Sequence, residues 1–227
     1  MQKLSKVFAG ILALCLFAAV PWQEAAANDQ KRLVVRAQLA VEEFLEDQEF
    51  DAMRVYVQNA YGVLVVPDLL RAGFFVGAEV GRGVLLVRDV NSGEWSSPAF
   101  YDIYGGSLGI QFGGKSSDVV FTIMNRGAVD QLLANKVKLG TDASVAVGPL
   151  GKGLGAATSA QFGEDFYVFA RSKGLYGGLS LDGSVVLPLP EWNNAYYSAD
   201  VRPVDVLLNR VTPNPASTGL QQALAQF

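Results

Sequence analysis

The sequence contains no histidine and only one cysteine, and each shortage excludes a kind of chemistry. Without an imidazole there is no Ser-His-Asp or Cys-His catalysis and no histidine-ligated metal. A single thiol can build neither a structural zinc site nor an internal disulfide. Charged residues are also scarce, at 18% against about 25% in an average soluble domain, whereas half of the 227 residues are hydrophobic and 24 are glycine. This composition predicts one apolar, glycine-rich folded domain.

The first 27 residues have the organisation of a cleavable secretory signal. A positively charged start is followed by an apolar run of 14 residues (7–20), and then by the small residues Ala25–Ala27. The run is shorter than the roughly 20 residues that a transmembrane helix needs. Cys15 follows Leu14 rather than a small residue, so the pattern favours a cleaved signal over a lipid anchor. We therefore expect cleavage after Ala27, which gives a periplasmic or secreted protein. Peripheral association with a membrane is compatible with this location.

The chain left after such cleavage is acidic. Residues 28–227 carry 16 basic and 21 acidic side chains and no cysteine, which gives a net charge of −5. An acidic chain without a run of arginine or lysine is a poor nucleic-acid binder. Attraction to an anionic surface would therefore require a local basic patch.

Helices are expected at both ends of the domain, with strands between them. Residues 28–60 show apolar residues at helical spacing, and a break near Gln48–Asp51 divides this segment into two helices. Residues 61–188 form a β-rich core, in which hydrophobic residues alternate with a period of two. Residues 189–227 predict short helices and a tail. The best alternating runs are 74–81, 137–147 and 175–182, and the short helices expected within and after the core are Ala128–Asn135, Trp192–Tyr197 and Pro203–Asn209.

Glycine is abundant inside these expected strands, where it normally weakens a sheet. Its presence indicates bends, bulges or close approach of the backbone. A curved sheet uses glycine in this way. The fold class we predict is α+β, with a glycine-rich, strongly curved antiparallel sheet or small barrel-like core and with N-terminal and C-terminal helices.

Three short motifs match catalytic or nucleotide-binding patterns, but none has the required context. Residues 109–116 fit the phosphate-binding loop, yet strand-like residues follow where a helix is needed. Residues 105–109 fit the nucleophile elbow, whose Ser107 would need a histidine base. Residues 151–156 loosely fit a dinucleotide fingerprint outside any βαβ unit. These matches are interpreted as consequences of the glycine content.

Three carboxylates among the expected strands remain as candidates for chemistry: Glu79, Asp102 and Asp142. Two carboxylates could form an acid–base pair for sugar hydrolysis. Their spacing supports no particular pair, and acids on the solvent face of strands are the ordinary case. We therefore expect no enzymatic activity, no cofactor and no metal site.

A longer pattern runs in order through most of the domain. Taken together, its segments resemble the SYLF domain, also called the Ysc84 actin-binding domain: Gly62–Asp89, Trp95–Gly113, Asp118–Leu133, Val137–Gly151 and Asp165–Val186. The resemblance implies lipid binding, since eukaryotic members bind phosphoinositides, in some cases through an amphipathic N-terminal helix, and fungal members bind actin. Bacterial members with secretion signals look like lipid-binding proteins of the cell envelope. Export would separate this chain from cytosolic actin and phosphoinositides, so only lipid binding is carried over.

The resulting hypothesis is a non-enzymatic lipid-binding protein of the bacterial cell envelope that recognises anionic phospholipid through a local basic and apolar surface. The candidate lipid-binding residues are Lys31, Arg32 and Arg36 on the first helix, Lys136 and Lys138 on the polar face of one strand, and Lys152, Arg171 and Lys173 near turns. Two alternatives stay open. One is a periplasmic carrier that holds an apolar ligand inside the curved sheet. The other is a structural or protein-interaction module with an envelope protein as its partner.

Overall fold

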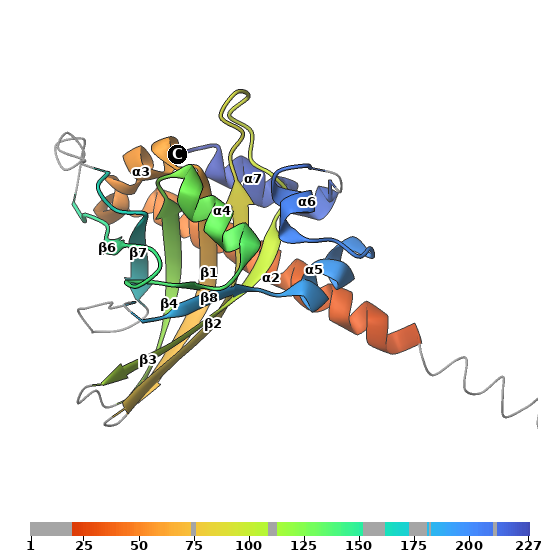
Figure 1. Cartoon of the computed structure of the whole chain (residues 1–227), viewed down its shortest axis with the longest axis horizontal. Coiled ribbons are helices and arrows are strands. Elements are labelled where there is room, and N and C mark those ends of the chain that lie inside the picture. The colour runs from red at the N-terminus through yellow and green to blue at the C-terminus, as the bar shows by residue number, and fades with distance from the viewer. Residues whose placement is uncertain are drawn as a thin grey trace, which may run out of the picture.

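The computed structural model of the chain describes residues 20–73, 76–108, 113–151, 162–172, 181, 183–210 and 213–227. One sheet of eight strands forms the centre, with helices on both of its faces (Figure 1). The helices are α2 (Val20–Glu46), η1 (Gln48–Phe50), α3 (Met53–Asn59), α4 (Arg126–Ala134), α5 (Pro190–Tyr197), α6 (Pro203–Leu207), η3 (Pro215–Ser217) and α7 (Thr218–Leu224). The strands are β1 (Gly62–Gly73), β2 (Val76–Val87), β3 (Ala99–Leu108), β4 (Gly113–Ile123), β5 (Val137–Lys138), β6 (Val145–Val147), β7 (Phe166–Ser172) and β8 (Val185–Pro188).

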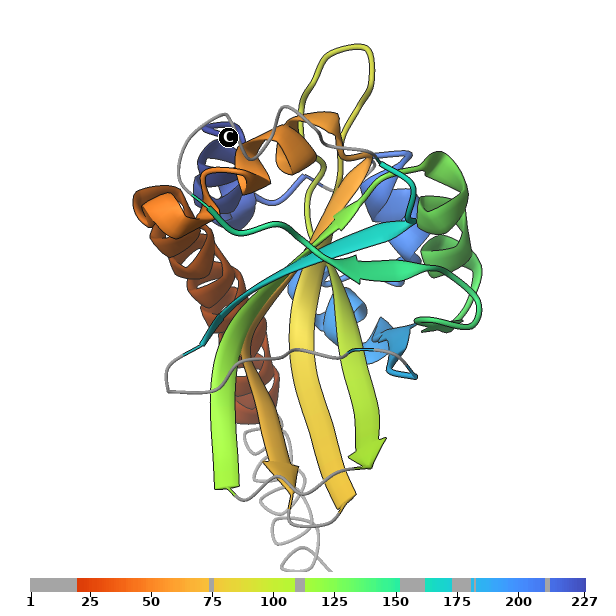
Figure 2. The ribbon, with the colours of Figure 1, turned by 90° about the vertical axis from the view of Figure 1, so that its left-hand side faces the viewer.

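The sheet is a curled half-barrel with the strand order β5-β8-β3-β2-β1-β4-β7-β6. Every neighbouring pair is antiparallel except β6 and β7, which run parallel. The four central strands are long, and their far ends extend beyond α3, α4 and α7 (Figure 2). The predicted α+β fold with a strongly curved, largely antiparallel sheet is thereby confirmed.

The first core lies between the sheet and α2. Helix α2 buries residues at helical spacing, such as Ala37, Val41 and Phe44, against residues of β1 such as Val63 and Val65. Helices α3, α5 and α7 complete this layer. One side of the sheet is thus covered by helices that come from the two ends of the chain.

The second core lies on the opposite face of the same strands. Leu64 alternates with the two valines that face α2, and it packs in a cluster with Tyr101 and Phe121 from the neighbouring strands. The short helix α4 covers this cluster, and Tyr101 donates a hydrogen bond to the backbone oxygen of Leu132 in that helix (3.0 Å). The upper part of the sheet is therefore buried on both faces.

Strand β1 contains a bulge that changes which side chains face α2. Its register shifts by one residue against both neighbours, between Val65 and Leu70 on one side and between Val66 and Leu69 on the other. Asp68 lies in the shifted segment with φ of 54°, a left-handed value that aspartate tolerates better than most residues. The backbone N–H that the bulge leaves at this position donates to the carboxylate of Asp118 (3.0 Å).

Most of the predicted elements are found. The break between the two N-terminal helices falls at η1, where the Asp47 carboxylate accepts from the backbone N–H of Glu49 (3.0 Å). Helices α4, α5 and α6 lie at the expected places, the first of them capped by Asn125, which accepts from Ala128 N (2.8 Å). Of the residues that fit the phosphate-binding loop, 113–116 are described, and they begin β4, which continues as a strand to Ile123, as expected for a chance match.

The prediction of one strand over 137–147 is wrong. This run supplies β5 and β6, which lie at opposite edges of the sheet. A turn separates them, since Gly140 has φ of 76° and the Asp142 carboxylate accepts from the backbone N–H of Lys138 (2.8 Å). Of the other alternating runs, 74–81 is described only from Val76 onward, and 175–182 lies outside the described residues except for Leu181.

Candidate functional site

The middle of α2 exposes a surface that is both basic and apolar. Lys31, Arg32 and Arg36 are all exposed, and Val35 and Leu39 between and beyond them are each 51% exposed. These positions recur at three- and four-residue spacing, so they share the side of the helix that faces away from the core. The three basic residues predicted on the first helix therefore form one cluster, which we call the α2 basic surface.

The ion pairs around this surface are open to solvent. Arg32 Nη1 lies 3.4 Å from Asp29 Oδ1, and Arg36 Nη1 lies 3.1 Å from Asp68 Oδ2 in the bulge of β1. Lys31 has no ion-pair partner among the described residues. Exposed pairs of this kind contribute roughly 0–1 kcal/mol each. An anion such as a lipid phosphate can therefore compete for these guanidinium groups at little cost.

A partly buried ion pair lies beside the α2 layer, between β2 and β3. Arg82 Nε donates to Asp102 Oδ1 (2.6 Å) and Nη2 donates to Oδ2 (3.1 Å). The guanidinium carbon lies 4.0 Å from the centre of the Trp192 ring in α5, and the Tyr104 hydroxyl donates to Asp102 Oδ2 (2.9 Å). The hydrogen bonds to this carboxylate raise the pKa of Arg82 and the pKa of Tyr104.

A second buried carboxylate lies on the other face of the sheet. Glu79 accepts from Arg71 Nε (2.9 Å) and Nη2 and from the Ser184 hydroxyl (3.3 Å). Burial and the neighbouring Arg71 charge lower the pKa of Lys115, which stands opposite Arg71 on β4. Glu79 and Asp102 are therefore not the solvent-facing acids that the sequence analysis expected.

This arrangement does not make the two carboxylates an acid–base pair. Each carboxylate is held by its own arginine. Asp102 is the register partner of Arg82 and shares its face of the sheet. Glu79 lies an odd number of positions from Arg82 along β2, so the two carboxylates lie on opposite faces. Asp142, the third acid considered, is exposed and stabilises the turn between β5 and β6. Glu79 and Asp102 neutralise two partly buried arginines and fix the register of the long strands.

Arg171 in β7 belongs to an acidic environment rather than to the α2 basic surface. Its guanidinium is paired with Glu43 and lies 3.9 Å from Asp47 Oδ2, both at the C-terminal end of α2. With Glu46 and Glu49 these acids line an open pocket of about 720 Å³. Helix α2 therefore carries its exposed positive charge near its middle and negative charge at its C-terminal end, where carboxylates oppose the helix dipole.

The other predicted basic residues do not join the α2 basic surface. Lys136 and Lys138 are both exposed, but they lie at the β5 edge, which is separated from β1 by β8, β3 and β2. Lys152 and Lys173 lie outside the described residues. Among the described candidates, the structure thus brings together Lys31, Arg32 and Arg36 and leaves Lys136, Lys138 and Arg171 elsewhere.

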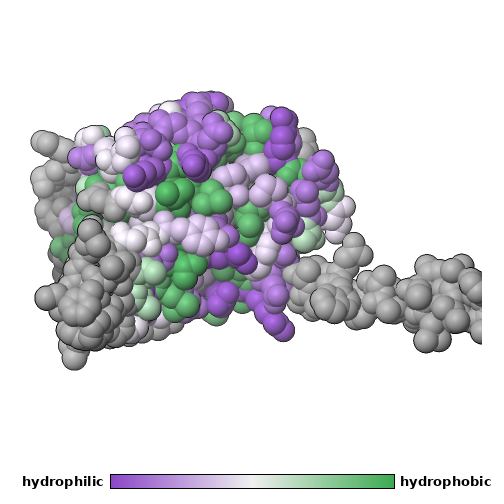
Figure 3. Space-filling model, turned by 60° about the horizontal axis from the view of Figure 1, so that its bottom comes forward, coloured by the Kyte–Doolittle hydropathy of each residue, from purple (hydrophilic) through white to green (hydrophobic). Residues whose placement is uncertain are grey.

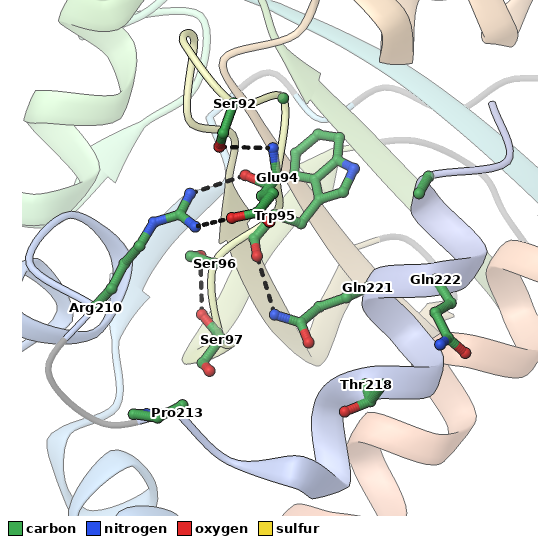
Figure 4. Close-up of a pocket in the computed structure, with 12 residues that line it drawn as sticks. Ser92, Glu94, Trp95, Ser96, Ser97, Arg210, Pro213, Thr218, Gln221 and Gln222 are labelled. Atoms are coloured by element: carbon green, nitrogen blue, oxygen red, sulfur yellow. Dashed lines mark hydrogen bonds and ion pairs between the residues drawn. The ribbon is translucent and has the colours of Figure 1, made fainter.

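A surface pocket of about 530 Å³ lies between the loop after β2 and helix α7 (Figure 4). Arg210 reaches across it, where Nη2 donates to the backbone oxygen of Glu94 (2.8 Å). Gln221 Nε2 donates to the backbone oxygen of Trp95 (3.0 Å) on the other side. The remaining lining is mostly hydroxyl and amide side chains: Ser92, Ser96, Ser97, Thr218 and Gln222.

The pocket has one arginine and one glutamate, so its lining carries no net charge. It therefore does not match an anionic ligand. Sequence reasoning missed this pocket because it exists only where segments more than 100 residues apart meet, and neither segment carries a motif of its own.

Two further observations concern metal binding and membrane spanning. No group of three metal-ligating side chains occurs in the part of the chain that the structure describes. Within that part there is also no helix with the length and hydrophobicity needed to cross a bilayer.

Comparison with known proteins identifies the family. The family model described as Ysc84, Las17-binding protein actin regulator, matches residues 104–227, more than half of the chain. The SH3 domain-containing YSC84-like protein 1 of Bos taurus is 32% identical over 165 residues, which cover 72% of this chain and 48% of that protein. The protein of the same name from Homo sapiens is 33% identical over 154 residues, 67% of this chain and 44% of that protein.

A fungal relative gives a similar result. Protein YSC84 of Saccharomyces cerevisiae is 34% identical over 184 residues, which cover 78% of this chain and 39% of that protein. The chain spans about half the length of the curated relatives it matches, or less. With a family model that matches more than half of its residues and several relatives above 30% identity, this chain belongs to the Ysc84 family.

Proposed function

We propose that this protein is a non-enzymatic module of the bacterial cell envelope that binds anionic phospholipid through the α2 basic surface. The observation that carries the proposal is the exposure of three cations, Lys31, Arg32 and Arg36, beside the exposed apolar side chains of Val35 and Leu39. A helix with this composition lies in the plane of a membrane interface, where cations meet phosphates and apolar side chains enter the acyl boundary.

The electrostatic contribution supports binding that depends on salt. Each lysine or arginine near an anionic leaflet contributes about 1 kcal/mol at low ionic strength. Three such residues give about 3 kcal/mol, which corresponds to a factor of over 100 in affinity. The net negative charge of the whole chain opposes this attraction at long range, so orientation toward the membrane depends on the local charge of α2.

Export, which we propose together with this function, would strengthen the basic surface. Cleavage after Ala27 would leave an α-amino group on Asn28, three residues before Lys31. This group is largely protonated at neutral pH and adds to the positive charge at the same end of α2. A mass spectrum of the exported protein tests the position of the new N-terminus.

Vesicle co-sedimentation tests lipid binding with a matched pair of variants. Lys31→Glu/Arg32→Glu reverses two charges on α2, and Lys136→Glu/Lys138→Glu makes the same change at the exposed β5 edge. We expect wild-type protein to sediment with vesicles that contain phosphatidylglycerol and to be released as salt rises from about 50 to 300 mM. The α2 variant should lose at least about tenfold in affinity, and the β5 variant should lose much less. Equal recovery with neutral and anionic vesicles, independent of salt, would refute the proposal.

A second candidate function is binding to a protein, and the comparisons favour it. The matching family model is described by binding to Las17 and by actin regulation, and its matched region, 104–227, begins after α2 and β1. An exported chain would not meet cytosolic actin, so the partner would be another envelope protein. Capture of one defined envelope protein by the chain in the absence of lipid, unchanged in the Lys31→Glu/Arg32→Glu variant, would support this alternative.

A further inference from the structure

Three apolar side chains form a row across the far end of the sheet. Leu70 on β1 is the register partner of Val80 on β2, and Val80 is the register partner of Tyr104 on β3. Their exposed fractions are 54%, 46% and 46%. Register partners on neighbouring strands lie on the same face, so the three side chains form one contiguous apolar strip, which we call the tip row.

The tip row faces the same side of the sheet as α2. Val80 precedes Arg82 by two residues on β2, and Arg82 packs on Trp192 in the helical layer that contains α2. On β1, Leu70 follows Asp68 by two residues, and Asp68 pairs with Arg36 of α2. The α2 basic surface and the tip row are therefore joined through the Arg36–Asp68 contact. Figure 3, which brings the bottom of the view in Figure 1 forward, shows apolar surface interleaved with polar surface.

The strands that carry the tip row are held rigidly. The Tyr104 hydroxyl donates to Asp102, which is fixed in turn by two hydrogen bonds from Arg82. On the opposite face the Arg71–Glu79 pair joins β1 to β2 at the adjacent register position. Apolar side chains held in place at a sheet end, instead of being packed, stay in contact with water at a cost in free energy. Such a strip is suited to an apolar partner.

We propose that the tip row enters the hydrocarbon boundary of the membrane and contacts acyl chains while the α2 basic surface binds headgroups. This inference rests on the proposed function and adds the apolar half of the contact. The occupant is a lipid layer because Arg36 of the α2 basic surface contacts Asp68, two residues before Leu70, and the cations of that surface complement an anionic headgroup layer. Tyr104 has the amphipathic character of residues at membrane interfaces, since its ring is exposed and its hydroxyl is hydrogen-bonded.

A site-specific fluorescent label tests the depth of insertion. All variants carry Cys15→Ser, so that Val80→Cys or the control Asp130→Cys supplies the single thiol for an environment-sensitive dye. Asp130 is exposed on α4, on the opposite face of the sheet. On addition of vesicles of phosphatidylcholine and phosphatidylglycerol, we expect a blue shift and loss of iodide quenching at position 80 and no change at position 130. A label at position 80 that stays accessible to iodide on sedimented vesicles overturns the inference and leaves headgroup binding intact.

Substitutions separate the two halves of the contact. Leu70→Asn/Val80→Asn removes apolar groups without a change of charge, and we expect roughly a tenfold loss of affinity with an unchanged salt dependence. Lys31→Glu/Arg32→Glu should instead weaken the salt dependence itself. An unchanged circular dichroism spectrum and melting temperature shows that the apolar variant folds. Unaltered affinity in a folded apolar variant contradicts the inference.

Two further outcomes would overturn the inference. A blue shift at position 80 that grows with protein concentration in the absence of vesicles would show that the tip row joins two copies of the chain, and this overturns the inference. If the wild-type protein fails to sediment with any anionic vesicle at low salt, the inference and the proposed function fall together.

Discussion

The Arg82–Asp102 pair offers the most direct test of how buried charge stabilises this sheet. Asp102→Asn keeps the size of the side chain but removes the anion that two guanidinium nitrogens bind. Breaking a buried pair costs about 3–5 kcal/mol when the remaining charge is fully enclosed. The Arg82 side chain is 36% exposed, against 6% for Asp102, and an asparagine oxygen still accepts one hydrogen bond. We therefore expect a loss of about 2 kcal/mol in the free energy of unfolding.

Thermal and urea denaturation followed by circular dichroism measure this loss. For a domain of about 200 residues, 2 kcal/mol lowers the melting temperature by roughly 4–8 °C. Asp130→Asn is the control, because this exposed carboxylate on α4 should stay within about 0.5 kcal/mol of wild type. Arg82→Met combined with Asp102→Asn should cost less than the sum of the two single changes, since the double variant leaves no unpaired buried charge. The reasoning is refuted if Asp102→Asn is as stable as the control.

Three further predictions concern the core and the effect of pH. Burial alone would raise the pKa of Asp165, but hydrogen bonds from neighbouring side chains and a backbone N–H outweigh it and lower the pKa. The contribution of Asp165 to the stability of the fold is therefore present above a pH of about 4 and is lost as the pH falls through the folded pKa. Asp165→Asn should flatten the acid limb of a stability–pH curve. Gly83→Ala would bring a methyl group within 2.5 Å of a backbone oxygen of β1, so the free energy of unfolding should fall by about 2–4 kcal/mol or folding should fail. In the control Gly163→Ala, the new methyl group meets no atom within 4 Å, so the urea midpoint should stay nearly unchanged. Asn193 is fully buried and accepts from the backbone N–H of Phe100 (2.8 Å), so Asn193→Ala should lower the free energy of unfolding by about 2–3 kcal/mol. Urea denaturation measures this loss, and a loss no larger than that of a surface change would contradict this role.

The helical ends of the fold could be predicted because local chemistry decides them. Apolar spacing defines the buried side of α2, and the Asp47 carboxylate caps the start of η1 by accepting from the backbone N–H of Glu49. Pro190 and Pro203 at the first helical positions mark α5 and α6 in the same way. These signals lie within a few residues of each other, so the sequence alone contains them.

The arrangement of the strands depends on partners that are distant in the chain. Alternation along 137–147 is equally compatible with one strand or with two, and only the turn at Gly140 and Asp142 sends β5 and β6 to opposite edges. The burial of Glu79 and Asp102 likewise depends on the register that brings an arginine beside each of them. An acid in an alternating run looks the same whether it faces water or an arginine.

The candidate lipid-binding residues could likewise be predicted from the sequence only in part. Lys31, Arg32 and Arg36 cluster because one helix carries them, and periodicity was sufficient to predict this. Lys136 and Lys138 were expected on the polar face of one strand. Both are exposed, but only Lys138 lies in β5, Lys136 comes just before it, and their distance from α2 follows from the strand order. The division of the chain into a 27-residue signal and one domain stays a prediction, as does export.

The extra residue in β1 has a consequence for how this sheet tolerates change. Because the bulge at Asp68 shifts β1 against both neighbours, the upper and lower halves of the strand follow opposite odd–even rules. Deleting the extra residue would leave equal numbers of residues on β1 and β2 between the two halves, so Leu70 would still stand opposite Val80, and the loss would fall on the contacts that Asp68 makes with Arg36 and Asp118.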